Sequence, residues 1–366
     1  MTAWLDARNL LAIRLDNIGD VIMLGPALRA IKETSARARI TLLATPGGAT
    51  AVPLLPWVDD VMVWRPVWQD LGNLAFDPPR EQKLIDVLAA RAFDGALIFT
   101  SFSQTPHVAG YACYLAGIPL RAGESKEFGG GTLSTELRGA PDDMHQVDRN
   151  LRLVEHLGFV AEHRQLSISI PTAARSSTGD LLQRVGLSPE RPYVLLHPGA
   201  SASARRYPVE RLGQVARGLR QRGWPVLVTG VDREAELVEA VVRAAPGAAS
   251  MVGGTTLAEY AALIERAALV VCGNTLPMHL ADALGTPVLV LFSGTDLETQ
   301  WSPRAAPFRL LRRPTSCHPC YRFDCPIGLP CLDIPAEDVV DQALALLHQA
   351  TVHHSIPLHD LVAVAE

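Results

Sequence analysis

A short loop near the start of the chain carries two carboxylates between an apolar run and a helical pattern. Leu10–Leu15 precedes a loop that holds Asp16, Asn17, Gly19 and Asp20. Gly19 suits a sharp turn or a close approach to a ligand, and we expect Asp16 to be a solvated loop acid. Asp20 would fall at or near the N-cap of the helix that follows, and capping is the simplest interpretation of this residue alone. The other interpretation is a general base for a hydroxyl, because a helix N-terminus favours an anionic carboxylate.

A second loop, in the other half of the chain, has the composition of an anion site. Gly199–Ala204 contains only glycine, alanine and serine, so its amides could approach an anion, and Ser201 and Ser203 add hydroxyl donors. Arg205 follows, and Pro208 suits the first turn of a helix. Amides at a helix start together with a guanidinium would suit a diphosphate. Neither G-x4-G-K-[ST] nor G-x-G-x-x-G occurs here, and a mobile surface loop is the alternative.

A third polar loop follows the apolar run Leu269–Cys272. Asn274 and Thr275 are good capping residues for the next helix, and His279 would lie in its first or second turn. An ordinary capped helix with a half-buried histidine and a ligand-contacting helix start both fit this segment.

Four cysteines cluster late in the chain, at Cys317, Cys320, Cys325 and Cys331. Four thiolates could bind zinc tetrahedrally. The spacing C-x2-C-x4-C-x5-C lacks the two tight, well-separated pairs of a zinc ribbon. A compact loop with proline turns is therefore preferred to a structural metal.

The elements that must position these loops alternate between strands and helices in both halves. Expected strands are the apolar runs Leu11–Leu15, Ile40–Ala44, Asp60–Trp64, Ala96–Phe99, Tyr193–Leu196, Val226–Thr229, Leu269–Cys272 and Val288–Phe292. Expected helices are Val21–Glu33, Arg80–Ala92, His107–Ala116, Val147–Leu157, Pro208–Arg222, Arg233–Ala244, Leu257–Arg266, Pro277–Leu284 and Ala336–Gln349. Continuous apolar strands indicate parallel sheets buried on both faces. The pattern predicts two doubly wound α/β domains facing a cleft, with ligands beyond the carboxyl ends of the strands.

The predicted boundary lies in an extended linker over Ser167–Ser177. The first domain would cover residues 1–170, the second 180–349, and a tail 350–366. The chain has 366 residues, 48% of them hydrophobic and 19% charged, with a net charge of −5. This composition indicates a folded protein and offers no basic field for nucleic acid. The start lacks a signal peptide, and no apolar run reaches the roughly 18 residues of a membrane span. We therefore expect a cytoplasmic protein with at most peripheral membrane contact.

These segments, together and in this order, resemble glycosyltransferase family 9, whose best-known members are the ADP-heptose:lipopolysaccharide heptosyltransferases. The matching stretches are Ile13–Leu28, Leu195–Ala200 with Arg205 and Tyr207–Pro208, Val228–Gly230 with Glu234, Pro277–Leu280, and the stretch from Cys317 to Cys331. The resemblance implies a GT-B fold of two Rossmann-like domains with the active site between them. It places the acceptor in the N-terminal domain and the nucleotide-sugar in the C-terminal domain. It also implies inversion at the anomeric carbon without an obligatory metal.

The resemblance implies a role for individual residues. Asp20 matches the catalytic base, with Asn17 and Gly19 on the acceptor side. Arg205 stands where the family often has a lysine on the donor phosphates, and Glu234 matches an acid that holds the ribose. The stretch from Met251 to Leu257 matches a loop that brackets the nucleobase. The donor-side residues are Ser201, Ser203, Arg205, Thr229, Glu234, Met251, Val252, Asn274, Thr275, Leu276 and His279.

One segment departs from the family pattern. The family commonly has Asp-Ser/Thr-Gly before the Pro-Met-His stretch, whereas this chain has Asn274, Thr275 and Leu276. An amide can still hydrogen-bond sugar hydroxyls but lacks the charge, and Leu276 could keep a backbone amide from the phosphate. The difference bears on the identity of the donor sugar and on activity.

The resemblance implies transfer of a sugar, a heptose in the first place, from ADP-heptose to a hydroxyl of a lipopolysaccharide-type glycan or a small natural product. No cofactor is required beyond this nucleotide-sugar co-substrate. Two alternatives stay open: a non-catalytic nucleotide-sugar-binding protein, and a nucleotide-sugar epimerase of GT-B fold.

Overall fold

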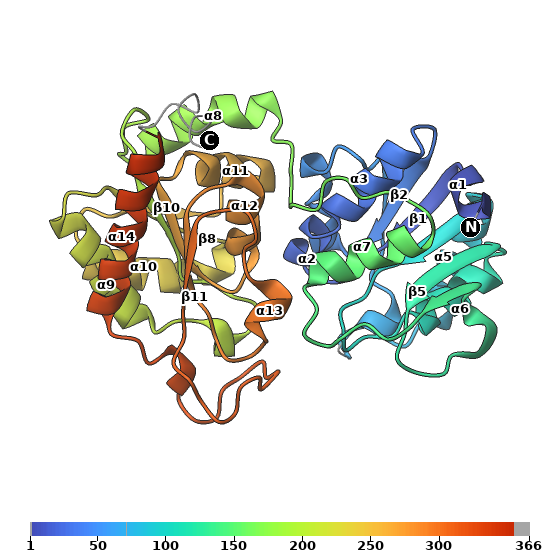
Figure 1. The fold of residues 1–366 in the computed structure, drawn as a ribbon. Coiled ribbons are helices and arrows are strands. Elements are labelled where there is room, and N and C mark those ends of the chain that lie inside the picture. Colours follow the sequence, from blue (N-terminus) through green and yellow to red (C-terminus); the bar gives the residue numbers. More distant parts are fainter. Residues whose placement is uncertain (1, 71, 355–366) are drawn as a thin grey trace, which may run out of the picture. The chain divides into compact units, whose positions relative to one another are not determined.

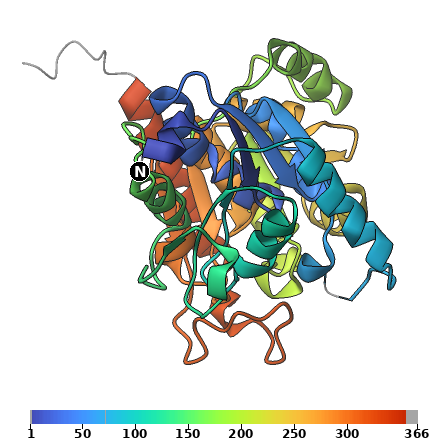
Figure 2. The same cartoon turned by 90° about the vertical axis from the view of Figure 1, so that its right-hand side faces the viewer.

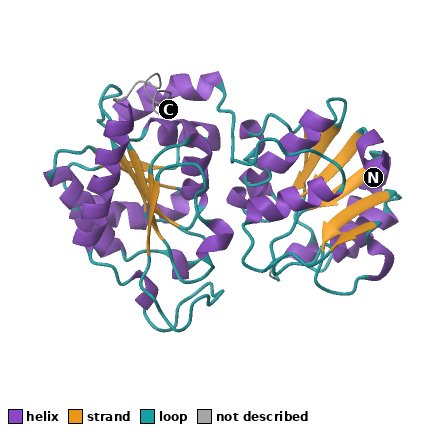
Figure 3. Ribbon diagram, viewed as in Figure 1, coloured by secondary structure: helices purple, strands orange, loops and turns teal. Residues whose placement is uncertain are grey.

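The computed structural model describes residues 2–70 and 72–354. The chain divides into two compact units, Met1–Ser169 and Ile170–Glu366. Each unit contains a six-stranded sheet, parallel throughout, with helices on both faces (Figure 3). The predicted α/β class with two doubly wound, Rossmann-like domains is confirmed.

In unit 1 the first strand lies at the centre of the sheet, whose order is β3-β2-β1-β4-β5-β6. The strands are β1 Asn9–Ile13, β2 Arg39–Ala44, β3 Asp60–Val63, β4 Gly95–Ile98, β5 Leu120–Glu124 and β6 Thr135–Leu137. The helices are α1 Thr2–Asp6, α2 Ile18–Ile22, α3 Gly25–Thr34, α4 Pro46–Ala49, α5 Pro78–Ala90, α6 His107–Leu115 and α7 Gln146–His156, with the 3-10 turns η1 Val52–Leu54, η2 Val67–Gln69 and η3 Gly130–Thr132. Helices α3 and α7 pack together on one face, and α5 and α6 on the other (Figure 1).

The helix predicted over Val21–Glu33 is wrong, because the structure has two helices there. α2 ends at Ile22 and α3 begins at Gly25. Pro26 stands in the first turn of α3, and a proline at this place could not donate a backbone hydrogen bond to the carbonyl of Ile22. The break leaves α2 as a five-residue helix that begins before Val21.

In unit 2 the sheet has the order β12-β11-β10-β7-β8-β9. The strands are β7 Val194–His197, β8 Val226–Gly230, β9 Ala249–Val252, β10 Leu269–Gly273, β11 Val288–Leu291 and β12 Phe308–Leu311. The helices are α8 Thr172–Arg184, α9 Val209–Gln221, α10 Ala235–Ala244, α11 Leu257–Arg266, α12 Leu276–Leu284, α13 Glu298–Trp301 and α14 Ala336–His354, with the 3-10 turns η4 Ser203–Arg205, η5 Asp232–Glu234 and η6 Pro330–Leu332. Helix α9 packs between α10 and α14, and α11 packs against α8 and α12 (Figure 1).

The expected linker Ser167–Ser177 is wrong in its second part, where α8 begins at Thr172. Pro171 immediately precedes this helix, a position compatible with a helix start, so the proline and serines do not mark a loop. Of the predicted tail 350–366, the first five residues belong to α14, and 355–366 lie outside the described residues. No helix in the described part of the chain combines the length and the hydropathy needed to cross a membrane.

Candidate active site

The polar loops of the sequence analysis follow the central strands of the two sheets. In unit 1, Arg14 comes directly after β1, and Gln104 lies in the loop after β4, the strand that pairs with β1. In unit 2, η4 follows β7 and α12 follows β10, and these two strands are also paired. The neighbouring central strands of each sheet are its topological switch point, where α/β proteins bind ligands at the carboxyl ends.

Arg14 organises the unit 1 loop. Its side chain is fully buried, and Nη2 donates to Oδ1 of Asp20 at 3.0 Å. Its Nε lies 2.8 Å from Oδ2 of Asp16, at ion-pair distance. One buried guanidinium therefore contacts both carboxylates of the loop.

The expectation that Asp16 is a solvated loop acid is wrong. Its side chain is 11% exposed. Gln69 of η2 donates to Oδ1 of Asp16 at 2.9 Å, and Gln104 donates to the same oxygen. Burial raises the pKa of Asp16, Arg14 opposes this shift, and the nearby charge of Asp20 adds to it. Asp16 is therefore part of a buried charge cluster.

Asp20 lies at the third position of α2, and Asn17 occupies the N-cap. Asp20 therefore lies near the N-cap, as expected, but inside the helix, because α2 begins at Ile18 and not at Val21. Oδ2 of Asp20 accepts from the backbone N–H of Asn17 at 3.2 Å, and its side chain is 14% exposed. Gly19 is buried in the same turn. Two hydrogen bonds therefore fix the Asp20 carboxylate while part of it stays accessible.

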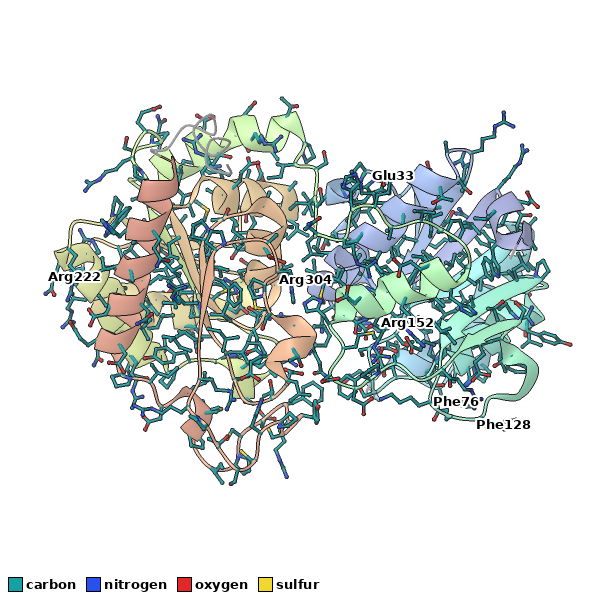
Figure 4. All side chains as sticks on the ribbon, in the orientation of Figure 1. Glu33, Phe76, Phe128, Arg152, Arg222 and Arg304 are labelled. Carbon is teal, nitrogen blue, oxygen red and sulfur yellow. The ribbon has the colours of Figure 1, made fainter. Side chains whose placement is uncertain are left out.

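Helix α7 holds the end of α2 in place. Asn150 is buried and donates to the carbonyl oxygen of Met23, the C-cap residue of α2, at 3.0 Å. Gln146 in turn donates to Oδ1 of Asn150 at 2.9 Å. Arg152 of the same helix, labelled in Figure 4, pairs with Glu124 at the end of β5 at 2.6 Å. The edge of the sheet beside Asp20 is therefore built from charged and amide side chains.

In unit 2, Arg205 contacts a buried acid, Asp296, in the loop after β11. Nη2 of Arg205 lies 2.9 Å from Oδ2 of Asp296, and Nε donates to Oγ1 of Thr295 at 3.2 Å. Thr295 also donates to Oδ2 of Asp296 at 2.6 Å. The Arg205 side chain is 28% exposed. Asp296 therefore orients the Arg205 side chain, which stays partly exposed to solvent.

Of the two residues expected to cap α12, Thr275 occupies the N-cap position and Asn274 lies just before it. The Asn274 side chain is buried and uses both ends of its amide. Nδ2 donates to Oδ2 of Asp296 at 3.2 Å, and Oδ1 accepts from the backbone N–H and the hydroxyl of Ser293, each at 3.1 Å. An aspartate here would face Asp296 with an oxygen instead of a donor. The amide therefore suits this network.

The remaining helix-start residues lie around the same strand end. Leu276 is half-buried as the first residue of α12. His279 is buried one turn later, and its ring meets Trp301 edge-on at a centroid distance of 6.4 Å. The proposed hydroxyl donors of the anion loop are both exposed, and Ser203 donates to Asp324. Its hydroxyl is thus directed at the cysteine-bearing loop.

Glu234 ends η5 and is buried beneath the β7 strand end. Its Oε2 accepts from the backbone N–H of Val231 at 3.1 Å and lies 3.7 Å from Nε2 of His197. Nδ1 of His197 lies 3.3 Å from Oγ1 of the buried Thr229. Burial lowers the pKa of His197, and Glu234 opposes this shift. A Cβ at position 199 would overlap the Glu234 carboxyl, so a larger residue there would force this carboxyl to move.

The stretch assigned to a nucleobase loop is partly strand. Met251 and Val252 are the last two residues of β9, and the loop proper begins at Gly253 and Gly254, with φ of 58° and 65°. The expectation of a loop from residue 251 is therefore wrong by two residues. Left-handed backbone favours glycine at both positions.

The four clustered cysteines lie in a loop that projects from the lower edge of unit 2, drawn in orange-red in Figures 1 and 2. Cys317 is exposed, Cys331 is buried, and Cys320 and Cys325 are intermediate. Burial raises the pKa of Cys331. Within residues 2–70 and 72–354, no three or more His, Cys, Asp or Glu side chains are grouped as a metal site requires.

Several residues of these clusters were not predicted from the sequence, among them Arg14, Gln69, Gln104 and Asp296. Arg14 stands in an apolar run, and a buried arginine two residues before an acid was an available signal. The two glutamines come from distant loops and carried no local pattern.

Comparison with known proteins agrees with this architecture. The family model described as glycosyltransferase family 9 (heptosyltransferase) matches residues 99–329. Lipopolysaccharide heptosyltransferase 2 of Escherichia coli (strain K12) is 25% identical over 351 residues, covering 91% of this chain and 96% of that protein. A glycosyl transferase family 9 structure from Veillonella parvula superposes with a TM-score of 0.78 at 19% identity, covering 93% of this chain and 98% of the other. The structure of E. coli ADP-heptose lps heptosyltransferase II gives a TM-score of 0.74 at 22% identity, covering 94% and 99%.

The family model covers well over half of the chain, and the solved relatives share its fold over more than 90% of its length. The protein is therefore a glycosyltransferase, and the chain belongs to glycosyltransferase family 9.

Proposed function

We propose that this protein transfers a heptose from ADP-heptose to a hydroxyl of a lipopolysaccharide-type glycan, with inversion at the anomeric carbon. The proposed donor is taken from a similar solved structure, the E. coli ADP-heptose lps heptosyltransferase II. The proposed acceptor is taken from lipopolysaccharide heptosyltransferase 2 of E. coli, to which the chain is similar over nearly its whole length. Because nucleotide-sugars are made in the cytoplasm, the proposal also places the protein there.

The observation that carries this proposal is the setting of Asp20. Its carboxylate is fixed by Arg14 and by the Asn17 amide at the end of the central strand of unit 1, and it remains partly exposed. In the proposed reaction the acceptor oxygen forms a bond to the anomeric carbon as the bond to the diphosphate oxygen breaks. Asp20 accepts the hydroxyl proton, and ADP leaves.

Unit 2 would supply the donor site. Arg205 and the backbone amides at the start of α12 would stabilise the charge that develops on the departing diphosphate. Glu234 would hold the ribose, and the loop that begins at Gly253 would border the base. The Asn274 amide would lie beside the donor through its contact with Asp296.

Asp20→Asn tests the proposal. We expect turnover to fall by about 10²–10⁴-fold, because a general base contributes on that order, while ADP binding stays unchanged. The assay follows ADP release from ADP-heptose with heptose-deficient lipopolysaccharide as acceptor, and calorimetry gives the Kd for ADP. Asp86→Asn on the exposed side of α5 is the matched control. Undiminished turnover in Asp20→Asn would show that another group is the base.

A further inference from the structure

Asp16 has no part in the reaction just described, yet more side chains contact it than contact Asp20. Gln69, Gln104 and Arg14 converge on its carboxylate from η2, from the loop after β4 and from the end of β1. Three segments far apart in the sequence thus meet at one carboxylate. Because three side chains fix a carboxylate that has no assigned role, we expect it to act on the group it contacts, the Arg14 guanidinium.

The neighbour that Asp16 shares is the Arg14 guanidinium. Arg14 is fully buried and contacts Asp16 through Nε and Asp20 through Nη2. The charged groups of this cluster are one guanidinium and two carboxylates, and Arg149 of α7 is a further cation that acts on Arg14. The two glutamines are neutral. The three-residue cluster therefore carries one excess negative charge when both acids are ionised.

Protonation of a base that is paired with a buried cation removes the counter-ion of that cation. Neutral Asp20 would no longer balance Arg14, and an uncompensated buried charge is strongly unfavourable. Burial raises the pKa of Asp16, but Arg14 and the hydrogen bonds from Gln104 and Gln69 favour its ionised form. With Asp16 ionised on the same guanidinium, Arg14 keeps a counter-ion throughout the reaction. Asp20 can then accept a proton without leaving Arg14 unpaired.

We propose that Asp16 is a positioning residue that acts through Arg14: it balances the guanidinium when Asp20 is protonated, and it holds the guanidinium where it orients Asp20. This inference rests on the proposed role of Asp20 as the base. Asp16 itself touches neither acceptor nor donor in this scheme.

Asp16→Asn tests the inference. With Asp20 as the only counter-ion of Arg14, proton uptake by Asp20 becomes less favourable. We expect kcat to fall by about 10-fold, a part of the full contribution of a general base, and the acid limb of the kcat–pH profile to move to lower pH. The KM for ADP-heptose and the Kd for ADP should stay within about twofold, because the interaction lost is made only during proton transfer. Asp86→Asn again serves as the control.

A double variant separates this role from general damage. Because Asp16 acts through Asp20, Asp16→Asn/Asp20→Asn should be no slower than Asp20→Asn alone. An additional loss, or an unmoved acid limb in Asp16→Asn, would overturn the inference. If Asp16→Asn does not unfold cooperatively, Arg14→Lys replaces it: an ammonium lacks the fork that spans both carboxylates, so kcat should fall at unchanged ADP affinity, and an unchanged kcat overturns the inference.

The two hypotheses fail in different ways. If Asp20→Asn loses turnover but Asp16→Asn has a normal rate and pH profile, the role inferred for Asp16 is wrong and the proposed function stands. Full turnover in Asp20→Asn removes the proposed base, and the inference with it.

Discussion

At the scale of single residues, the absence of a side chain at Gly199 leaves space for the carboxyl group of Glu234. Gly199 follows β7 by two residues, and the Glu234 carboxyl occupies the space that a Cβ would need. Glu234 is held there by the Val231 amide and lies close to His197. A glycine at position 199 therefore lets this acid of the proposed ribose site keep its place.

Gly199→Ala should displace the Glu234 carboxyl and weaken ADP binding. We expect the Kd for ADP to rise by about 10-fold, which corresponds to about 1.4 kcal/mol. Thermal unfolding should change little, because the far end of one side chain can move. Calorimetry measures the first quantity and differential scanning calorimetry the second. Glu234→Gln, which keeps the shape of the side chain, is the comparison; equal ADP affinity in Gly199→Ala and the wild type would contradict a role of this acid in nucleotide binding.

The sequence predicted the place of Asp20 from local pattern, because the residue follows an apolar strand and the structure has it in the first turn of the next helix. Its role as the base came from the family resemblance and stays a prediction. Asp16 was misassigned because its partners, Gln69 and Gln104, are more than fifty residues away and only the folded sheet brings them to it. The contact of Asn274 with Asp296 was missed for the same reason, since Asp296 comes from the loop after the next strand.

At the scale of elements, the short helix α2 depends on its neighbours. A five-residue helix is too short to be stable in isolation, and α2 carries Asp20. Its C-terminal carbonyl at Met23 accepts from the buried Asn150 of α7. The position of Asp20 is therefore maintained by tertiary contacts rather than by helix propensity.

Asn150→Ala should destabilise unit 1 and reduce turnover. Leaving the Met23 carbonyl and the Gln146 amide without this partner costs about 1–3 kcal/mol of unfolding free energy. The rate should also fall, because α2 is less firmly held, whereas ADP affinity should not change. Urea unfolding and the turnover assay measure the two effects. Gln82→Ala, which removes an exposed amide bonded to Asp86 on α5, is the control; equal stability of the two variants would contradict the anchoring role.

The sequence predicted most interior strands and the edge strand β3, and it missed four other strands. β5, β6, β9 and β12 were not expected, and three of them are edge strands. Edge strands are only partly buried, so they lack continuous apolar runs: β6 reads Thr-Glu-Leu, and β12 contains Arg309. The break between α2 and α3 could have been predicted from Pro26, whereas α8 could not, because Pro171, Ser176 and Ser177 are equally typical of a loop.

At the scale of the whole molecule, each unit is one continuous stretch of chain with its own core. The core of unit 2 joins β7, β8, β10 and β11 to α9, α10 and α14, and that of unit 1 joins β1, β4, α5 and α6. The last described helix, α14, packs on α9 and on strands β10 to β12 of its own unit. All the proposed donor-binding residues lie within this second stretch.

Residues 170–354 should therefore fold alone and bind ADP without transferring sugar. A core of this size is sufficient for a cooperative domain, and the contacts among Arg205, Asp296 and Asn274 are all internal to it. We expect a single cooperative thermal transition and a Kd for ADP within about threefold of that of the full chain, a difference of less than 1 kcal/mol. Circular dichroism and calorimetry check both. Arg205→Ala in the same fragment should weaken ADP binding while the thermal transition persists. A fragment that folds but does not bind ADP, while the full chain does, would show that unit 1 supplies part of the nucleotide site.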